Sequence, residues 1–174
     1  QWEDLFGGRF RGLFVFAYNI VGDRAPLPPE QLFEPRGSLY GFDMTLIADG
    51  NTTIEHNLPL GVFYEDVLQF FSGSKTGYTP TLVVTYGGPA ADPYWRSHTE
   101  VWRHPLLQKH EPAAILNAKN ARREIAPDDD YRDDDSAREA AKLARRGVPV
   151  AIGAHGQEPG IAAHWELWSF VRGG

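Results

Sequence analysis

Two histidines stand at the ends of apolar, β-branched stretches of this chain. His56 lies near the end of the segment TTIEHN (52–57), and His155 near the end of VPVAIGAHGQ (148–157). A neutral imidazole can bind a zinc-type ion or accept a proton. We therefore take His56 as a candidate metal ligand and His155 as a metal ligand or a proton carrier. The competing interpretation of both residues is a structural histidine that is hydrogen-bonded to the backbone.

The other histidines carry weaker signals. His164 precedes Trp165 in an amphipathic stretch and is expected to pack against neighbours or to cap a helix. A long polar region contains three more histidines, which we expect to be solvated: His98, His104 and His110.

The acidic run PDDDYRDDDS, residues 127–136, invites comparison with a calcium loop. It lacks the central glycine and the terminal glutamate of an EF-hand loop. It therefore indicates a solvated turn that places acidic residues at a helix N-terminus.

The elements that must position His56 and His155 alternate between strands and helices. Short β-branched strands are predicted in MTLIADG (44–50) and TTIEHN (52–57). Largely buried strands are predicted in YTPTLVVTYGG (78–88) and VPVAIG (148–153). Between them, an apolar face predicts a helix that opens at Pro59 and ends in the glycines that follow. The face consists of Leu60, Phe63, Val67, Phe70 and Phe71.

Further helices are predicted in the second half of the chain. One or two helices are expected around PLLQKHEPAAILNAK, residues 105–119, within a long polar region. SAREAAKLARRG begins with a capping box formed by Ser136 and Glu139, and IAAHWELWSFVRGG is one more amphipathic helix. The recurring order of strand and helix predicts parallel strands with helical crossovers, and ligands at the carboxyl ends of the strands.

Composition limits the partners of the chain. Its 174 residues are 42% apolar and 23% charged, with a net charge of −6 and no cysteine. A negative charge argues against nucleic acid, whose binding depends on clustered Lys and Arg, so a small molecule or short peptide is the expected partner. The stretch GLFVFAYNIVG (12–22) is too short to span a bilayer, which takes about 20 residues, so no membrane partner is expected.

Three blocks of the sequence, in order, resemble a known family. Together they are similar to the C-terminal half of a metal-dependent amidohydrolase barrel. The blocks are ADGNTTIEHNLPL, GYTPTLVVTYGGP and GVPVAIGAHGQEPGIAAHWELWSFVRGG. The closest resemblance is to the imidazolonepropionase-like group that often follows a TolB-like propeller. It covers residues 37–174, whereas residues 1–36 match poorly.

The resemblance implies an α/β fold, a partial TIM (β/α)8 barrel with strands six to eight in the three blocks. It implies that His56 is the sixth-strand ligand of zinc or another divalent metal, and that His155 stands where the superfamily usually has an aspartate. The paired His-x-His of the first barrel strand is absent, so this chain can hold fewer ligands than its parent, and the sequence leaves both a bound metal and no metal open for it. The relatives that follow a propeller suggest an exported or periplasmic protein.

Two functional hypotheses follow. The first is a fragment of a metal-dependent hydrolase that acts on C–N bonds of amides, cyclic amides or dipeptides. The alternative is a non-catalytic truncated remnant that folds, or forms a homo-oligomer, through open strand edges. If the strand in YTPTLVVTYGG lies between the other two, His56 and His155 are two strand spacings apart, about 10 Å between backbones, and the side chains can converge on one ion.

Overall fold

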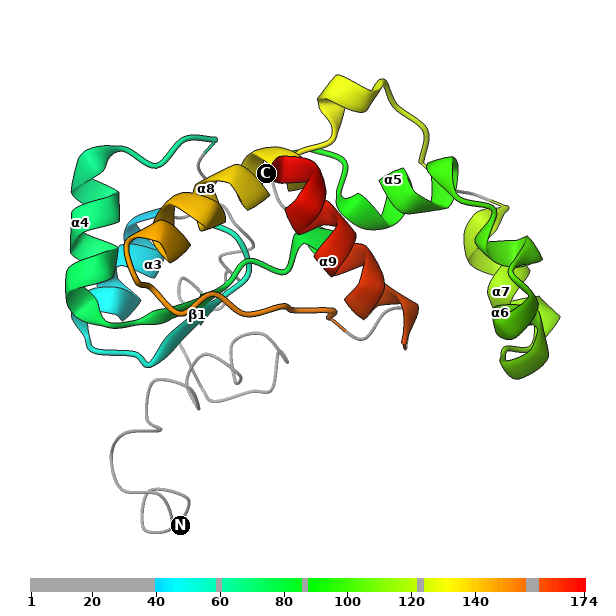
Figure 1. Ribbon diagram of the computed structural model, residues 1–174, viewed down its shortest axis with the longest axis horizontal. Helices are drawn as coiled ribbons and strands as arrows, with labels where there is room; N and C mark the ends of the chain where they lie inside the picture. Colours follow the sequence, from blue (N-terminus) through cyan, green and yellow to red (C-terminus); the bar gives the residue numbers. More distant parts are fainter. Residues whose placement is uncertain (1–39, 59–60, 86–87, 122–123, 156–159) are drawn as a thin grey trace, which may run out of the picture.

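The computed structural model of the chain describes residues 40–58, 61–85, 88–121, 124–155 and 160–174 (Figure 1). The poorly matched segment 1–36 lies outside the described residues. Helices make up most of the described part. None of the helices there is long and apolar enough to cross a membrane.

Helix and strand alternate at the start of the described part, and the elements described after β2 are helices. The strands are β1 (Thr53–Glu55) and β2 (Gly77–Thr79). The α-helices are α3 (Tyr40–Ala48), α4 (Glu65–Ser74), α5 (Ala91–His98), α6 (Pro105–His110), α7 (Ala113–Asn120), α8 (Asp133–Arg145) and α9 (Ile161–Gly173). The 3₁₀ helices are η3 (Leu82–Val84), η4 (Val101–Arg103) and η5 (Asp128–Asp130).

A short parallel sheet joins the segments that carry the candidate histidines. β1 pairs with β2 in parallel, with Ile54 opposite Tyr78. On its other edge, Tyr78 forms a parallel bridge with Val150. The N–H of Tyr78 donates to Pro149 O at 2.8 Å, and the N–H of Ala151 donates to Tyr78 O at 2.9 Å. β2 therefore lies between β1 and the third segment.

The expected partial TIM barrel is wrong for the described part of the chain. Barrel strands are typically about five or six residues long and are paired along both edges. Here β1 and β2 have three residues each, and the third segment joins through one bridge. The ladder ends before it can curve into a barrel wall, and the fold is a mostly helical one with a two-stranded parallel sheet.

Two of the predicted strands are shorter than expected. The strand expected over residues 78–88 stops after Thr79, because Pro80 has no N–H for the ladder and Thr81 adopts a left-handed φ of 54°. The strand expected in VPVAIG is limited to the bridge at Val150, and Ile152 is 47% exposed.

The segment MTLIADG is helical instead of extended. Most of it belongs to α3, in which the neighbouring residues Leu46 and Ile47 are both buried. Adjacent side chains of a strand point to opposite faces of the sheet, so a sheet with one covered face would bury only one of them.

The predicted helices are present with shifted boundaries. α4 begins at Glu65, not at Pro59, and Phe70 of its expected apolar face is 42% exposed. α6 and α7 occupy the stretch PLLQKHEPAAILNAK, and α9 covers the C-terminal stretch. α8 begins three residues before Ser136, so this serine lies inside the helix and does not cap it.

Most of the buried apolar residues in the described part of the chain fall into two clusters. The first lies among α3, α4, α8 and the sheet, and the second surrounds the N-terminal half of α9. α6 and α7 lie at the opposite end of the molecule from α3 and α4 (Figure 1). The first cluster comprises Leu46, Ile47, Ile54, Leu58, Phe63, Val67, Leu68, Phe71, Tyr78, Ala140, Leu143 and Val148, and the second Val83, Val101, Ala162 and Trp165.

α8 and α9 pack closely because small residues meet where they cross. Gly173 lies against Ala137, and a Cβ on Gly173 would come within 2.6 Å of Asp134 O. Beside this contact, Arg172 Nη1 pairs with the buried Asp133 Oδ1 at 2.6 Å. The contact requires glycine for its space, not for an unusual backbone conformation.

We expect Gly173→Ala to lower the free energy of unfolding by about 1–3 kcal/mol, because the added methyl group overpacks the crossing. Gly73→Ala is the matched control, since a Cβ there would meet no heavy atom within 4 Å. It should leave stability unchanged or raise it by up to about 1 kcal/mol through helix propensity. Urea unfolding of the two variants measures the difference, and equal stabilities would contradict the close packing.

Candidate functional site

The structure brings His56 and His155 together. His56 follows β1 directly, and His155 lies four residues beyond Ala151, the end of the bridged segment. The ring centroids are 5.1 Å apart, with the ring planes at 66° in an edge-on arrangement. His56 is half-buried and His155 is exposed. The pair thus combines one anchored imidazole with one that is open to solvent.

Both histidines adopt a left-handed backbone conformation. The φ of His56 is 71° and that of His155 is 56°. Positive φ is uncommon for residues other than glycine, although histidine tolerates it better than most. Such conformations persist where the surroundings impose them and are enriched at functional sites. Here they turn the chain sharply after the two outer segments of the sheet, on either side of β2.

A close backbone approach precedes His155. Gly153 lies against the end of β2, where a Cβ would come 2.6 Å from Thr81 Oγ1 and 2.7 Å from Thr79 Cγ2. Any side chain at this position would push the His155 segment away from β2. Glycine is therefore needed here for space.

Glu166 of α9 holds the same region together. Its side chain is fully buried, and its carboxylate accepts hydrogen bonds from three backbone N–H groups. Oε1 accepts from Leu82 at 2.8 Å and from Gly153 at 3.4 Å, and Oε2 accepts from Val83 at 3.0 Å. One side chain therefore ties both η3 and the His155 segment to α9.

Burial raises the pKa of Glu166 to about 7. The cost of removing the charge from water is the largest cause, and the three N–H donors oppose it by favouring the ionised form. The nearby Asp133 adds a smaller upward contribution. Glu166 therefore changes its charge near neutral pH while remaining inside the fold.

The two histidines are the donors that could hold a metal ion or move a proton at this site. The described part of the chain contains no group of three or more His, Cys, Asp or Glu side chains arranged for a metal ion. A catalytic zinc site uses three protein ligands and a water. The described residues thus supply two nitrogen donors toward such a site.

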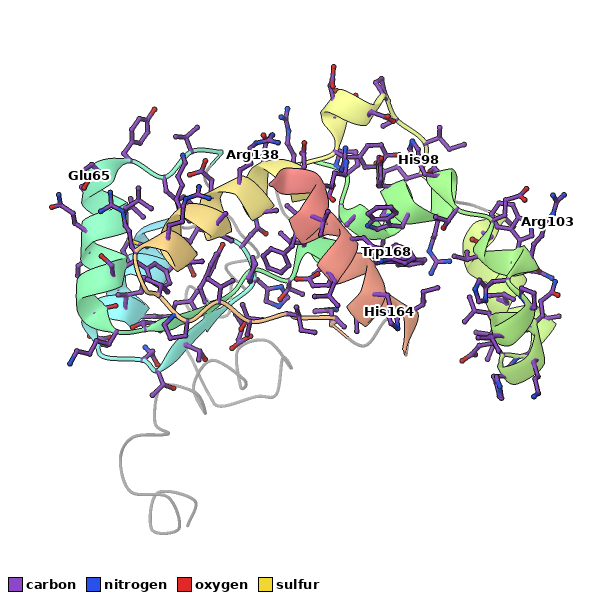
Figure 2. All side chains as sticks on the ribbon, in the orientation of Figure 1. Glu65, His98, Arg103, Arg138, His164 and Trp168 are labelled. Atoms are coloured by element: carbon purple, nitrogen blue, oxygen red, sulfur yellow. The ribbon has the colours of Figure 1, made fainter. Side chains whose placement is uncertain are left out.

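The remaining histidines have separate positions. His164 is exposed on α9, and its ring centroid lies 6.4 Å from that of Trp168 (Figure 2). Trp168 in turn packs edge-on against Trp95 of α5, with the ring centroids 5.3 Å apart. His98 is exposed on α5, as expected for a solvated histidine, and its ring also stacks on that of Tyr94 with the centroids 4.0 Å apart. Its Nε2 lies 3.0 Å from Asp128 Oδ1, so His98 joins α5 to η5.

The acidic run at residues 127–136 does place acids at a helix N-terminus, but it is not solvated throughout, because Tyr131, Asp133 and Ser136 are buried. Asp133, Asp134 and Asp135 form the first turn of α8. Asp133 is fully buried against Arg172. Burial raises the pKa of Asp133 in spite of this guanidinium. Its role is to join α8 to α9.

Sequence reasoning missed Glu166, although a signal was present. The residues of α9 that are buried follow a helical stripe of Ala162, Glu166, Ser169 and Gly173, joined by Trp165. A glutamate among small residues on a buried stripe needs hydrogen-bond partners. What could not be read from the sequence is that those partners come from η3 and Gly153.

We expect Glu166 to make stability pH-dependent. Because its pKa rises from 4.5 to about 7 on folding, the folded state retains this proton more tightly than the unfolded chain. The corresponding stability is fully present below about pH 4.5 and is lost as the pH rises through about 7, by at most about 3 kcal/mol. The free energy of unfolding of the wild type minus that of Glu166→Gln should therefore decrease over this interval.

Chemical denaturation between pH 4.5 and 8.5 measures this difference. Glu139→Gln is the matched control, because Glu139 is a second buried glutamate that accepts a backbone N–H, that of Phe63 at 2.8 Å. If the free energy of unfolding of Glu166→Gln decreases with rising pH as much as that of the wild type, the pH dependence does not come from Glu166.

Comparisons with known proteins leave the chain without an identified family. No family model matches it, and no curated protein or solved structure matches it significantly. These comparisons add nothing that links the chain to the amidohydrolase superfamily. Its function is therefore inferred from its own residues.

Proposed function

We propose that the chain is part of a metal-dependent hydrolase of C–N bonds, in which His56 and His155 supply two nitrogen ligands to zinc or another divalent ion. The observation that carries this proposal is the edge-on pairing of the two imidazoles. The resemblance of the segments around them to amidohydrolase motifs supports the choice of reaction class.

The spacing of the two rings fits such an ion. Two imidazoles on one tetrahedral zinc-type ion, each with a nitrogen about 2.1 Å from the metal, have ring centres about 5 Å apart. The observed separation is 5.1 Å. The left-handed backbone at both residues supports the same interpretation, because strained conformations are enriched at functional sites.

The two histidines have different roles in this proposal. The half-buried His56, fixed directly after β1, serves as an anchoring ligand. The exposed His155 serves as the second ligand or accepts a proton from the attacking water. When bound, the ion supplies Lewis acidity and lowers the pKa of a bound water to about 7.

The proposed substrate is a small molecule or short peptide with an amide, cyclic amide or dipeptide bond. The net charge of −6 disfavours nucleic acid as a partner. The resemblance to proteins that follow a propeller supports an exported or periplasmic location. These assignments come from composition and resemblance.

A second candidate is a non-catalytic remnant that folds or self-associates. One observation favours it: the described residues contain no set of three metal-binding side chains. On this interpretation the His56–His155 contact is a packing interaction between two turns. Binding of a metal to the two histidines distinguishes the candidates.

We expect the chain to bind one Co²⁺ or Zn²⁺ ion through both histidines. His56→Asn and His155→Asn should each weaken this binding at least about tenfold, because a ligand is lost. Asparagine is the suitable replacement, since it tolerates the left-handed backbone at both positions. Calorimetry with Zn²⁺ and the visible absorption of Co²⁺ measure the effect.

His110→Asn is the matched control, because His110 is an exposed histidine of α6. It should bind metal as the wild type does. Absence of binding in the wild type, or equal affinities in all four proteins, would overturn the proposal.

The chain by itself should not hydrolyse amide or lactam substrates measurably. The described part supplies two of the three protein ligands that a catalytic zinc site uses. The chain is incubated with an amide or a lactam substrate in the presence of added Zn²⁺, and chromatography measures the product formed. Turnover that is abolished by a chelator and restored by zinc would show that this expectation is wrong.

A further inference from the structure

The segment that carries His155 leaves the sheet before it reaches the histidine. Its sheet contact is the bridge at Val150, closed by the hydrogen bond from Ala151 N–H to Tyr78 O at 2.9 Å. Ile152, the next residue, is 47% exposed. The position of His155 therefore depends on contacts made beyond the bridge.

Glu166 provides an anchor beyond the bridge. Its Oε1 accepts the N–H of Gly153, two residues before His155, and the same oxygen accepts the N–H of Leu82. Oε2 accepts the N–H of Val83. The carboxylate thus holds the His155 segment against η3, which directly follows the end of β2.

The space at Gly153 supports this anchor. A Cβ on Gly153 would overlap Thr79 and Thr81, so the chain passes the end of β2 at the closest distance that glycine allows. His56 follows β1, which is paired with β2. Contacts to the end of β2 therefore determine the distance between the two histidines.

We propose that Glu166 is a positioning residue that keeps His155 beside His56 by holding Gly153 and η3 together. This inference rests on the proposed function, because that function assigns a role to the histidine pair. Glu166 itself contacts backbone N–H groups and acts on the pair only through the segment it holds.

Another buried glutamate provides an internal comparison. Glu139 of α8 also accepts a backbone N–H, but that of Phe63, and it pairs with Lys142 Nζ at 2.7 Å. It therefore holds the turn before α4. A general effect of losing a buried carboxylate should appear at both positions, whereas an effect on the histidine pair should appear at Glu166 alone.

The test measures the contact of the two rings in the full chain without metal. Wild-type protein with labelled histidines should give a through-space NMR cross-peak between the His56 and His155 rings. Glu166→Met keeps the side-chain length without an acceptor and should abolish the cross-peak, whereas Glu166→Gln keeps one acceptor oxygen and should retain part of it. Glu139→Met should leave the cross-peak intact. An intact cross-peak in folded Glu166→Met would overturn the inference.

Co²⁺ binding separates this inference from the proposed function. If the wild type binds Co²⁺, Glu166→Met should weaken the affinity about 10–100-fold, as expected for loss of a residue that orients ligands, and Glu139→Met should not. If the wild type binds no Co²⁺ but the cross-peak still depends on Glu166, the proposed function fails and the positioning role stands. Unchanged affinity together with an intact cross-peak in Glu166→Met would refute the positioning role alone.

Gly153→Ala keeps the test decisive if Glu166→Met does not fold. This variant retains the carboxylate and adds a methyl group where Thr79 and Thr81 leave no room. It should weaken the His56–His155 cross-peak, and Gly73→Ala, with open space around its new Cβ, should not. A cross-peak of wild-type intensity in Gly153→Ala would overturn the inference.

Discussion

The fully buried carboxylate of Glu166 is the interaction on which the arrangement around the histidines depends. Burying a carboxylate is costly unless hydrogen bonds compensate for the lost water. Three backbone N–H groups provide that compensation, two from η3 and one from Gly153. The compensation is incomplete, which is why burial still raises the pKa of Glu166. The folded chain tolerates the remaining free-energy cost, since the same hydrogen bonds join three segments of the chain.

Buried acidic side chains make several of the contacts that hold segments of this molecule together. Glu139 accepts the N–H of Phe63 in the turn before α4, and Asp133 pairs with Arg172 where α8 and α9 cross. In a barrel, neighbouring strands would hold such segments through their own backbone hydrogen bonds. Here the sheet ends after three residues, and the carboxylates of Glu139 on α8 and Glu166 on α9 accept hydrogen bonds from backbone N–H groups outside it. The helices therefore position the site as much as the strands do.

The histidine pair does not require a complete barrel. Parallel pairing of β1 with β2, and the bridge from Tyr78 to Val150, place the ends of the two outer segments on the same side of the sheet. The left-handed turns at His56 and His155 then bring the rings into contact. Two imidazoles at this spacing suit a zinc-type ion, and this is the basis of the proposed hydrolase function.

The sequence by itself determined the features that depend on local patterns. The helical stripe from Ile161, the glycine stop of α8 and the β-branched segment around Ile54 were all readable, because periodicity and special backbone conformations act over a few residues. It also identified His56 and His155 as the residues to compare. Tertiary contacts decided the rest. YTPTLVVTYGG has the composition of a strand, but Pro80 ends the ladder and Glu166 binds the N–H groups of η3 that a further strand would have used. Glu166 lies more than 80 residues from Leu82 and Val83 in the sequence and 13 from Gly153. Its effect on η3, on Gly153 and on the meeting of the two histidines therefore appears only in the folded molecule.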